Sequence, residues 1–312
     1  MTKNKIEGVK PFNKFWLKSC YYHQLIAGLS ALGVDRELFL LNAMVFAEEG
    51  FSADEGGILG AREFERTAGY RCKSCNISKR ALKRRIDKGM PVIVGVDCFY
   101  LESRPEMFGI RHELHFLLCY GYDLKTREAN VVDHAYRGSY EFREKVISLD
   151  NLLYANGMYR KRHPEKRFSC RVLRKAKVQK GALGLWSQMD LNRLLSSKKS
   201  SEKNLDELKR MFLSDLKELQ EKSEKITDYL QSMRTSLYCL SETRAFSQSK
   251  EKSALLDFLI SGYSNLLSLL WKMWRQENFS FAVTRMDGIL RKIDSVKETE
   301  EKVYDCLWEV CA

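Results

Sequence analysis

The sequence predicts an α+β domain over residues 1–180, followed by an all-α helical bundle over residues 181–312. Two observations lead to this division. In the first part, helical apolar periodicity is mixed with short β-branched runs that are typical of buried strands. In the second part, strand signals almost vanish and apolar residues recur at threes, fours and sevens, the spacing of amphipathic helices. Helices followed by antiparallel strands describe an α+β domain.

The first helix of the α+β domain is predicted to begin at Cys20 and to end before Gly33. Four apolar side chains share one face at helical spacing: Leu25, Ile26, Leu29 and Leu32. Glycine often follows the last turn of a helix because it adopts the left-handed conformation without steric cost. Cys20 is therefore expected in the first turn, where backbone N–H groups have no partner within the helix.

Three further segments precede the predicted sheet. Residues 37–46 form an apolar run that we expect to be helical, and the glycine-rich residues 50–60 are expected to form a loop. Residues 78–88 predict a basic helix, with Ser78 as its N-cap and Gly89 just past its end.

The predicted sheet is built from four short segments. Residues 92–96, Val-Ile-Val-Gly-Val, read as a buried strand, and residues 114–122 and 129–133 read as two more. Residues 123–127 join the last two as a hairpin turn, and residues 168–173 could add another strand within a basic tract.

The second part predicts three long helices. The first covers residues 205–237, and the others cover residues 255–274 and 281–308. The polar residues 196–203 are the best candidate for a linker or loop. Such a bundle could pack on the α+β domain or form a homodimer.

The net charge of +12 lies entirely in the first part. Residues 1–181 contain 33 basic and 21 acidic residues, and the excess peaks at residues 160–180, where ten basic residues face only Glu165. A basic patch suits nucleic acid, an anionic membrane surface or an acidic protein. A solvated strand with interspersed lysines explains the tract equally well.

The sequence predicts a cytoplasmic protein. The first ten residues contain no apolar stretch of the kind a signal peptide needs. The longest apolar run, residues 254–271, carries Asp257 and several other polar residues, which argues against a membrane span. Nine cysteines in such a chain are expected to be free thiols rather than a disulfide framework.

Three residues carry the predicted chemistry. Cys20 opens a helix, His115 lies on a predicted strand, and Asp133 ends the next one. A thiol has an ordinary pKa of roughly 8.5, and a helix start and a nearby imidazolium both lower that value. We expect Cys20 to act as a nucleophile, His115 as its base and Asp133 as the carboxylate that orients the histidine.

Four further residues could complete the site. The backbone N–H of Cys20 could bind an oxyanion, with Asn13 as a side-chain donor. Tyr21 is expected to form part of the core and pocket wall, and His23 lies on the same helical face as Cys20. Asp97, at the end of a predicted strand, could bind an amine or form a turn or salt bridge.

The order of these residues resembles the papain-like superfamily, in which a cysteine at a helix start precedes a histidine and then an asparagine or aspartate. More specifically, the chain resembles the amino-terminal domain family of the butirosin-biosynthesis acyltransferase. The matching stretches are Ser-Cys-Tyr-Tyr at residues 19–22, residues 91–101, and residues 112–133 from His-Glu-Leu-His to Val-Val-Asp. The likeness covers roughly the first half of the chain.

The resemblance implies an acyltransferase of antibiotic or nonribosomal-peptide biosynthesis. Members of the family take an acyl group from the phosphopantetheine thioester of an acyl or peptidyl carrier protein and pass it to an amine. Cys20, His115 and Asp133 would keep the roles given above, and no cofactor or metal would be bound by the enzyme itself. Carrier proteins are acidic, so one would give the basic tract at residues 160–180 a partner.

Other interpretations remain open at the level of sequence. The same three residues could serve a papain-like peptidase or amidase, or the chain could be a non-catalytic scaffold that binds an acidic partner. Cys20 could be a buried apolar residue, His115 a strand histidine and Asp133 a turn cap. A zinc site could combine the Cys-Lys-Ser-Cys motif at residues 72–75 with His112 and His115, although a single cysteine pair is a weak signal.

Overall fold

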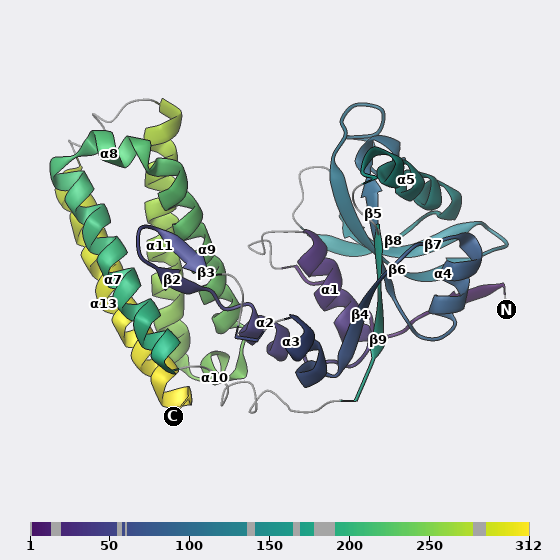
Figure 1. Ribbon diagram of the computed structural model, residues 1–312, viewed down its shortest axis with the longest axis horizontal. Coiled ribbons are helices and arrows are strands. Elements are labelled where there is room, and N and C mark those ends of the chain that lie inside the picture. Colours follow the sequence, from purple (N-terminus) through teal and green to yellow (C-terminus); the bar gives the residue numbers. More distant parts are fainter. Residues whose placement is uncertain are drawn as a thin grey trace. The chain divides into compact units, whose positions relative to one another are not determined.

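The computed structural model describes residues 2–13, 20–54, 58–59, 61–135, 141–164, 169–177, 191–276 and 285–311. These residues form two compact units (Figure 1). Unit 1 comprises residues 1–36 and 62–179, and unit 2 comprises residues 37–61 and 180–312. The chain therefore combines a sheet domain with a helical region, as an α+β interpretation predicts.

Unit 1 is built on an antiparallel sheet with the strand order β4-β9-β5-β6-β7-β8. The strands are β4 (Tyr70–Cys75), β9 (Cys170–Lys175), β5 (Val92–Asp97), β6 (Leu114–Asp123), β7 (Glu128–His134) and β8 (Phe142–Ser148). A short strand, β1 (Lys3–Lys5), also pairs with β6. β6 and β7 are therefore adjacent, as the hairpin prediction required.

Helices cover both faces of this sheet. The helices are α1 (Cys20–Ala31), α3 (Ala61–Ala68), α4 (Lys79–Ile86) and α5 (Leu149–Arg162), with a 3-10 turn, η1 (Cys98–Tyr100). Leu117 packs in a cluster with Leu82 of α4 and Leu152 of α5. Its neighbour Leu118 points to the opposite face, as successive strand residues do, and lies against Gly28 of α1.

The packing of α1 on the sheet fixes the position of its first residue. A side chain at Gly28 would come within 2.4 Å of Leu173 and 3.2 Å of Leu118, so glycine allows this close approach. Val92, Val94 and other β5 residues are buried beneath the helices, as their β-branched run predicted. Helix α1 thereby packs on β6, the strand that carries His115.

Unit 2 is a helical bundle that also holds a small hairpin. Its elements are α2 (Arg36–Asn42), α7 (Leu191–Ser214), α8 (Leu216–Glu221), α9 (Ser223–Ser241), α10 (Arg244–Ser247), α11 (Lys250–Gln276), α13 (Met286–Cys311) and the hairpin β2 (Phe46–Glu48) to β3 (Ser52–Asp54). The four longest helices lie side by side, with the hairpin against α7 and α9 (Figure 1).

Side chains of the bundle hold the hairpin through its backbone. Ser197 accepts a hydrogen bond from the N–H of Ala47 at 2.7 Å, and Asn204 accepts one from Phe51 at 3.1 Å. The amide nitrogen of Asn204 also donates to the carbonyl of Glu48 at 2.8 Å. Residues 37–61 therefore pack in unit 2, whereas the predicted division at residue 180 left them with the α+β part.

Several predicted elements differ from the structure. The predicted helix over residues 205–237 is interrupted at Asp215, which caps α8, and again before α9. The proposed linker, residues 196–203, lies inside α7, because its serines bond the hairpin and neighbouring helices. The helix expected over residues 37–46 ends at Asn42, and the loop expected over residues 50–60 contains β3.

Helix α11 is long and apolar enough over Lys250–Met273 to cross a membrane, by length and composition. Leu256, Leu259, Tyr263 and Leu266 of this helix are buried within unit 2. The same length and composition also occur in the core helices of soluble proteins, so the helix is weak evidence for a membrane span.

The hairpin attachment predicts a stability effect. Replacing Asn204 with alanine leaves a buried backbone N–H and a carbonyl without partners, so we expect a loss of about 1–3 kcal/mol in the free energy of unfolding. Urea unfolding followed by circular dichroism measures this loss. The exposed Ser196→Ala on the same helix should change stability by less than about 0.5 kcal/mol. Equal stability of the two variants would contradict the assigned attachment.

Candidate active site

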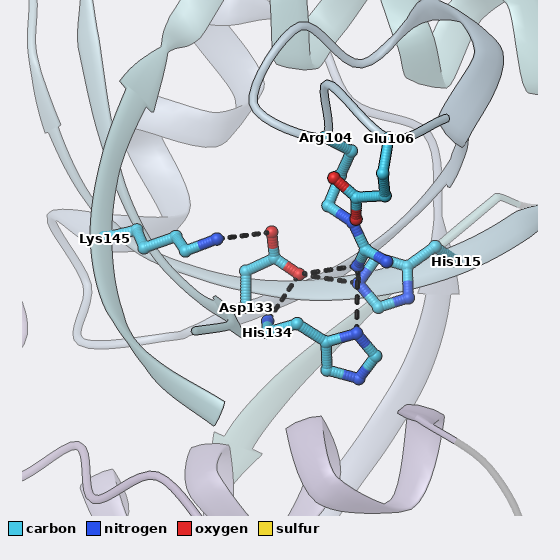
Figure 2. Close-up of polar contacts among 6 residues, drawn as sticks. All are labelled: Arg104, Glu106, His115, Asp133, His134 and Lys145. Atoms are coloured by element: carbon cyan, nitrogen blue, oxygen red, sulfur yellow. Dashed lines mark hydrogen bonds and ion pairs between the residues drawn. The ribbon is translucent and has the colours of Figure 1, made fainter. Parts of the chain in front are cut away.

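His115 and Asp133 form a buried hydrogen-bonded pair on adjacent strands. The Nε2 atom of His115 lies 2.7 Å from Oδ1 of Asp133 (Figure 2). The histidine is 5% exposed and the aspartate 0%, so water does not compete for this contact. The same carboxylate oxygen accepts the backbone N–H of His134 at 2.7 Å, which fixes its orientation.

Cys20 lies at the start of α1, within reach of this pair. His115 is close enough to influence the pKa of its thiol, as are the backbone groups of Phe116 and Tyr21. Because Nε2 of His115 faces Asp133, Nδ1 is the ring nitrogen left to the thiol. The structure therefore pairs His115 with Asp133, while a nucleophilic role for Cys20 stays a prediction.

The electrostatics of the three residues favour a charged pair. Burial alone would raise the pKa of the Cys20 thiol, but the hydrogen bond and charge of His115 lower it below its ordinary value. Burial also opposes the charged form of His115, yet its bonds to Asp133 and Cys20 raise its pKa to about 9. A thiolate beside an imidazolium is the reactive form of a cysteine nucleophile.

Arg104 is a member of the site that the sequence analysis missed. Its Nη1 lies 3.4 Å from Oδ1 of Asp133 and 3.0 Å from Nδ1 of His134, while its Nε donates to Glu106 at 2.6 Å (Figure 2). Nη1 also lies 3.3 Å from Nε2 of His115, but a nitrogen that donates to Asp133 cannot accept from arginine as well. The contact between Arg104 and His115 therefore brings together two positively charged groups.

Asp133 has one further cationic neighbour, Lys145, and lies beside the neutral ring of His134. Lys145 on β8 places Nζ 3.5 Å from its second oxygen, Oδ2. Burial raises the pKa of Asp133, but His115, Lys145 and Arg104 together hold it far below its usual value. Burial and the cationic neighbours lower the pKa of His134 to about 4, so its ring is neutral and accepts from Arg104.

The side chains of His115, Asp133 and His134 could in principle ligate a metal. Their ligand atoms all lie within 4.8 Å of one another. The same region is occupied by the guanidinium of Arg104, however, which places Nη1 within 3.4 Å of each residue. The side chains of Arg104 and Lys145 therefore supply the positive charge next to Asp133.

The predicted zinc alternative is not supported by the placement of its residues. Cys72 and Cys75 lie on β4, which is separated from β6 by β9 and β5. Strands are roughly 4.8 Å apart, so this separation exceeds any zinc-ligand distance. His112 is instead hydrogen-bonded to Asp97 at 2.7 Å.

The remaining predicted residues surround the site in different ways. The hydroxyl of Tyr21 lies 3.6 Å from the sulfur of Cys72, and its ring packs edge-on against Phe116. His23 is buried and stacks on Phe142 with 4.5 Å between ring centroids.

Asn13 and Asp97 both have partners within the chain. The side-chain oxygen of Asn13 accepts the backbone N–H of Phe142 at 2.6 Å. One carboxylate oxygen of Asp97 faces His112 and the other accepts the N–H of Phe99, capping η1. An oxyanion role for Asn13 and an amine-binding role for Asp97 stay predictions.

Comparison with known proteins agrees with the predicted resemblance. Residues 68–134 match the family model described as Butirosin biosynthesis protein H, N-terminal. This match supports the resemblance drawn from the sequence. The match includes His115 and Asp133 but begins after Cys20, so it gives no support to a role for Cys20. No curated protein matches the chain.

The charged pair predicts an unusual reactivity for Cys20. Alkylation by iodoacetamide, followed site by site with mass spectrometry, should show Cys20 reacting at lower pH than Cys72. The pKa of Cys72 is raised by burial, which makes it an internal control. In His115→Ala the pH at which Cys20 is half-reactive should rise, because burial still raises the pKa of the thiol and the imidazole no longer lowers it. An unchanged midpoint would show that the two side chains do not interact.

Arg104 predicts a second effect. Arg104→Met removes a cation that faces two carboxylates, and breaking a buried pair in this way typically costs about 3–5 kcal/mol. The exposed Arg111, in the same loop, faces Glu113 at 3.6 Å, and Arg111→Met should cost less than about 1 kcal/mol. Chemical unfolding of both variants at neutral pH measures the difference. Similar losses would mean that Arg104 does not stabilise the site.

Proposed function

We propose that this protein is a cysteine acyltransferase of secondary-metabolite biosynthesis. It would take an acyl group from the phosphopantetheine thioester of a carrier protein and pass it, through an acyl-Cys20 intermediate, to an amine. The observation that supports the proposal is the buried hydrogen bond between His115 and Asp133, together with a thiol at the start of α1 whose pKa the charge of His115 lowers. The match of residues 68–134 to a butirosin-biosynthesis family supports a biosynthetic enzyme.

In the first step the Cys20 thiolate attacks the carbonyl carbon of the thioester. The carbon–sulfur bond to the donor breaks, and the leaving thiolate takes the proton of the His115 imidazolium. Backbone N–H groups at the start of α1 are suited to bind the oxyanion of the tetrahedral intermediate. This use of a helix start and an adjoining sheet is what a papain-like site would do.

In the second step an amine attacks the acyl-Cys20 carbonyl. His115, now neutral, takes the proton from the amine, and Cys20 leaves as a thiolate. The sum is thioester plus amine giving amide plus thiol, with no cofactor needed. Exchange between two thioesters is nearly balanced in free energy, whereas amide formation is downhill, so a cysteine suits this transfer.

An acidic carrier protein is the partner we propose for unit 1. Exposed cations lie at the end of α5 and along both faces of β9: Arg160, Lys161, Arg171, Arg174 and Lys175. A positive charge excess of this kind attracts an acidic partner and speeds association at low salt. The same chemistry with water as acceptor would make the protein an amidase or peptidase, which the following experiment distinguishes.

Intact-mass analysis tests the proposed function. Wild-type protein mixed with an acyl-pantetheine thioester should gain the mass of the acyl group less one hydrogen, and an added amine should remove it as an amide. Cys20→Ala should show no gain, while Cys72→Ala, a matched control at a neighbouring thiol, should behave as wild type. Peptide cleavage without acylation would favour the peptidase, and neither reaction would leave a binding scaffold.

A further inference from the structure

Unit 2 contains a buried carboxyl group that the proposed chemistry does not use. Glu300 on α13 is 4% exposed and lies among α7, α9 and α11. Ser201 of α7 donates to one of its oxygens at 2.7 Å, and Tyr263 of α11 donates to the other at 2.8 Å. Because Ser201 uses its proton on Glu300, Tyr229 of α9 donates to Ser201 at 2.9 Å.

The partners of Glu300 in the described part of the bundle are hydroxyls, not cations. Ser201, Tyr229 and Tyr263 are neutral, and the charge that acts on Glu300, that of Glu202 on α7, has the same sign. A buried carboxylate without a counter-charge is costly, and protonation removes that cost. Burial accordingly raises the pKa of Glu300 to about 7, and repulsion from Glu202 adds to this effect.

A small cavity links Glu300 to the hairpin. Its volume is about 20 Å³, and its walls include Glu300, Tyr304 and Ser197 together with Val45 and Phe46 at the start of β2. A cavity of this size holds one water molecule. Ser197 bonds both the hydroxyl of Tyr304, at 2.8 Å, and the backbone of the hairpin. Water that solvates an ionised Glu300 would therefore enter where the hairpin closes the bundle.

We propose that Glu300 is a proton-binding site whose ionisation loosens the attachment of the β2–β3 hairpin to the bundle. With the proton bound, the carboxyl group fits its neutral surroundings and the hairpin stays closed. With the proton lost, the charge draws water into the cavity and the hairpin opens to admit it. The bundle is in this way a pH-sensitive element, independent of the thioester chemistry of unit 1.

The pH dependence of hairpin opening follows from the difference between the pKa of Glu300 in the open and closed states. In the open state Glu300 meets water and has its ordinary pKa of 4.5, whereas in the closed state its pKa is about 7. The closed state is fully favoured below the lower value and loses this advantage as the pH rises through the upper one. The equilibrium constant for opening should increase about tenfold per pH unit between pH 5 and 7 and level off above pH 7.

Amide hydrogen exchange of residues 44–54 tests this proposal on the full-length protein. Rates between pH 5 and 8, corrected for the intrinsic exchange of the same peptide unfolded, should show the expected rise in the wild type. Glu300→Gln, which mimics the protonated form, should remain protected at every pH. Glu301→Gln, at the exposed neighbouring position on α13, should keep the wild-type profile.

A further variant keeps the test decisive if Glu300→Gln does not fold. Tyr263→Phe removes a hydrogen-bond donor to the ionised carboxylate, which raises the pKa of Glu300 further in the closed state. The exchange rate should therefore level off at a higher pH than in the wild type. The proposal is overturned by a corrected exchange rate in the wild type that stays constant from pH 5 to 7. It is equally overturned if Glu300→Gln keeps the wild-type profile, or if Tyr263→Phe leaves the levelling point unchanged.

Discussion

The hydrogen bond between His115 and Asp133 is the contact on which the candidate site depends. An aspartate buried without water must have its charge balanced by the chain, and the balance comes from three cationic side chains, those of His115, Arg104 and Lys145. Of the three, His115 also interacts with Cys20. Asp133 stabilises the imidazolium form of His115, and the imidazolium in turn stabilises the thiolate form of Cys20. The lowered pKa of the thiol thus depends, through the imidazole, on a buried carboxylate.

Pairing of strands in the sheet fixes the positions of His115 and Asp133 relative to each other. Strand pairing of β6 with β7 brings the histidine and the aspartate together, and the tight approach of α1 at Gly28 holds the start of that helix in place. Backbone hydrogen bonds and close packing, rather than side-chain reach, therefore define the site. Rigid elements of this kind position reacting groups more accurately than loops do.

The pairing of His115 with Asp133 could be predicted, because the segments that contain these residues carry local signals. Cys20 opens an apolar helical pattern, and His115 and Asp133 lie on neighbouring strand patterns that one short turn connects. Arg104 and Lys145 could not, since nothing in an arginine on an irregular loop or a lysine on an edge strand distinguishes it from a solvated residue. Their roles arise only when the tertiary fold brings them to a buried charge.

In the fold, too, elements that follow from their own residues could be predicted, and elements that depend on contacts distant in sequence could not. Strands β5, β6 and β7 and helix α4 follow their own patterns of residues, including the Ser78 cap. The serines of residues 196–203 are polar enough to suggest a linker, yet they lie within a helix because the hairpin and other helices consume their hydroxyls. That hairpin leaves the ribosome roughly 140 residues before α7 does, and chain synthesis proceeds at about 5–20 residues per second. For several seconds Phe46 and Phe51, which are buried in the finished bundle, must therefore remain without the helices that cover them.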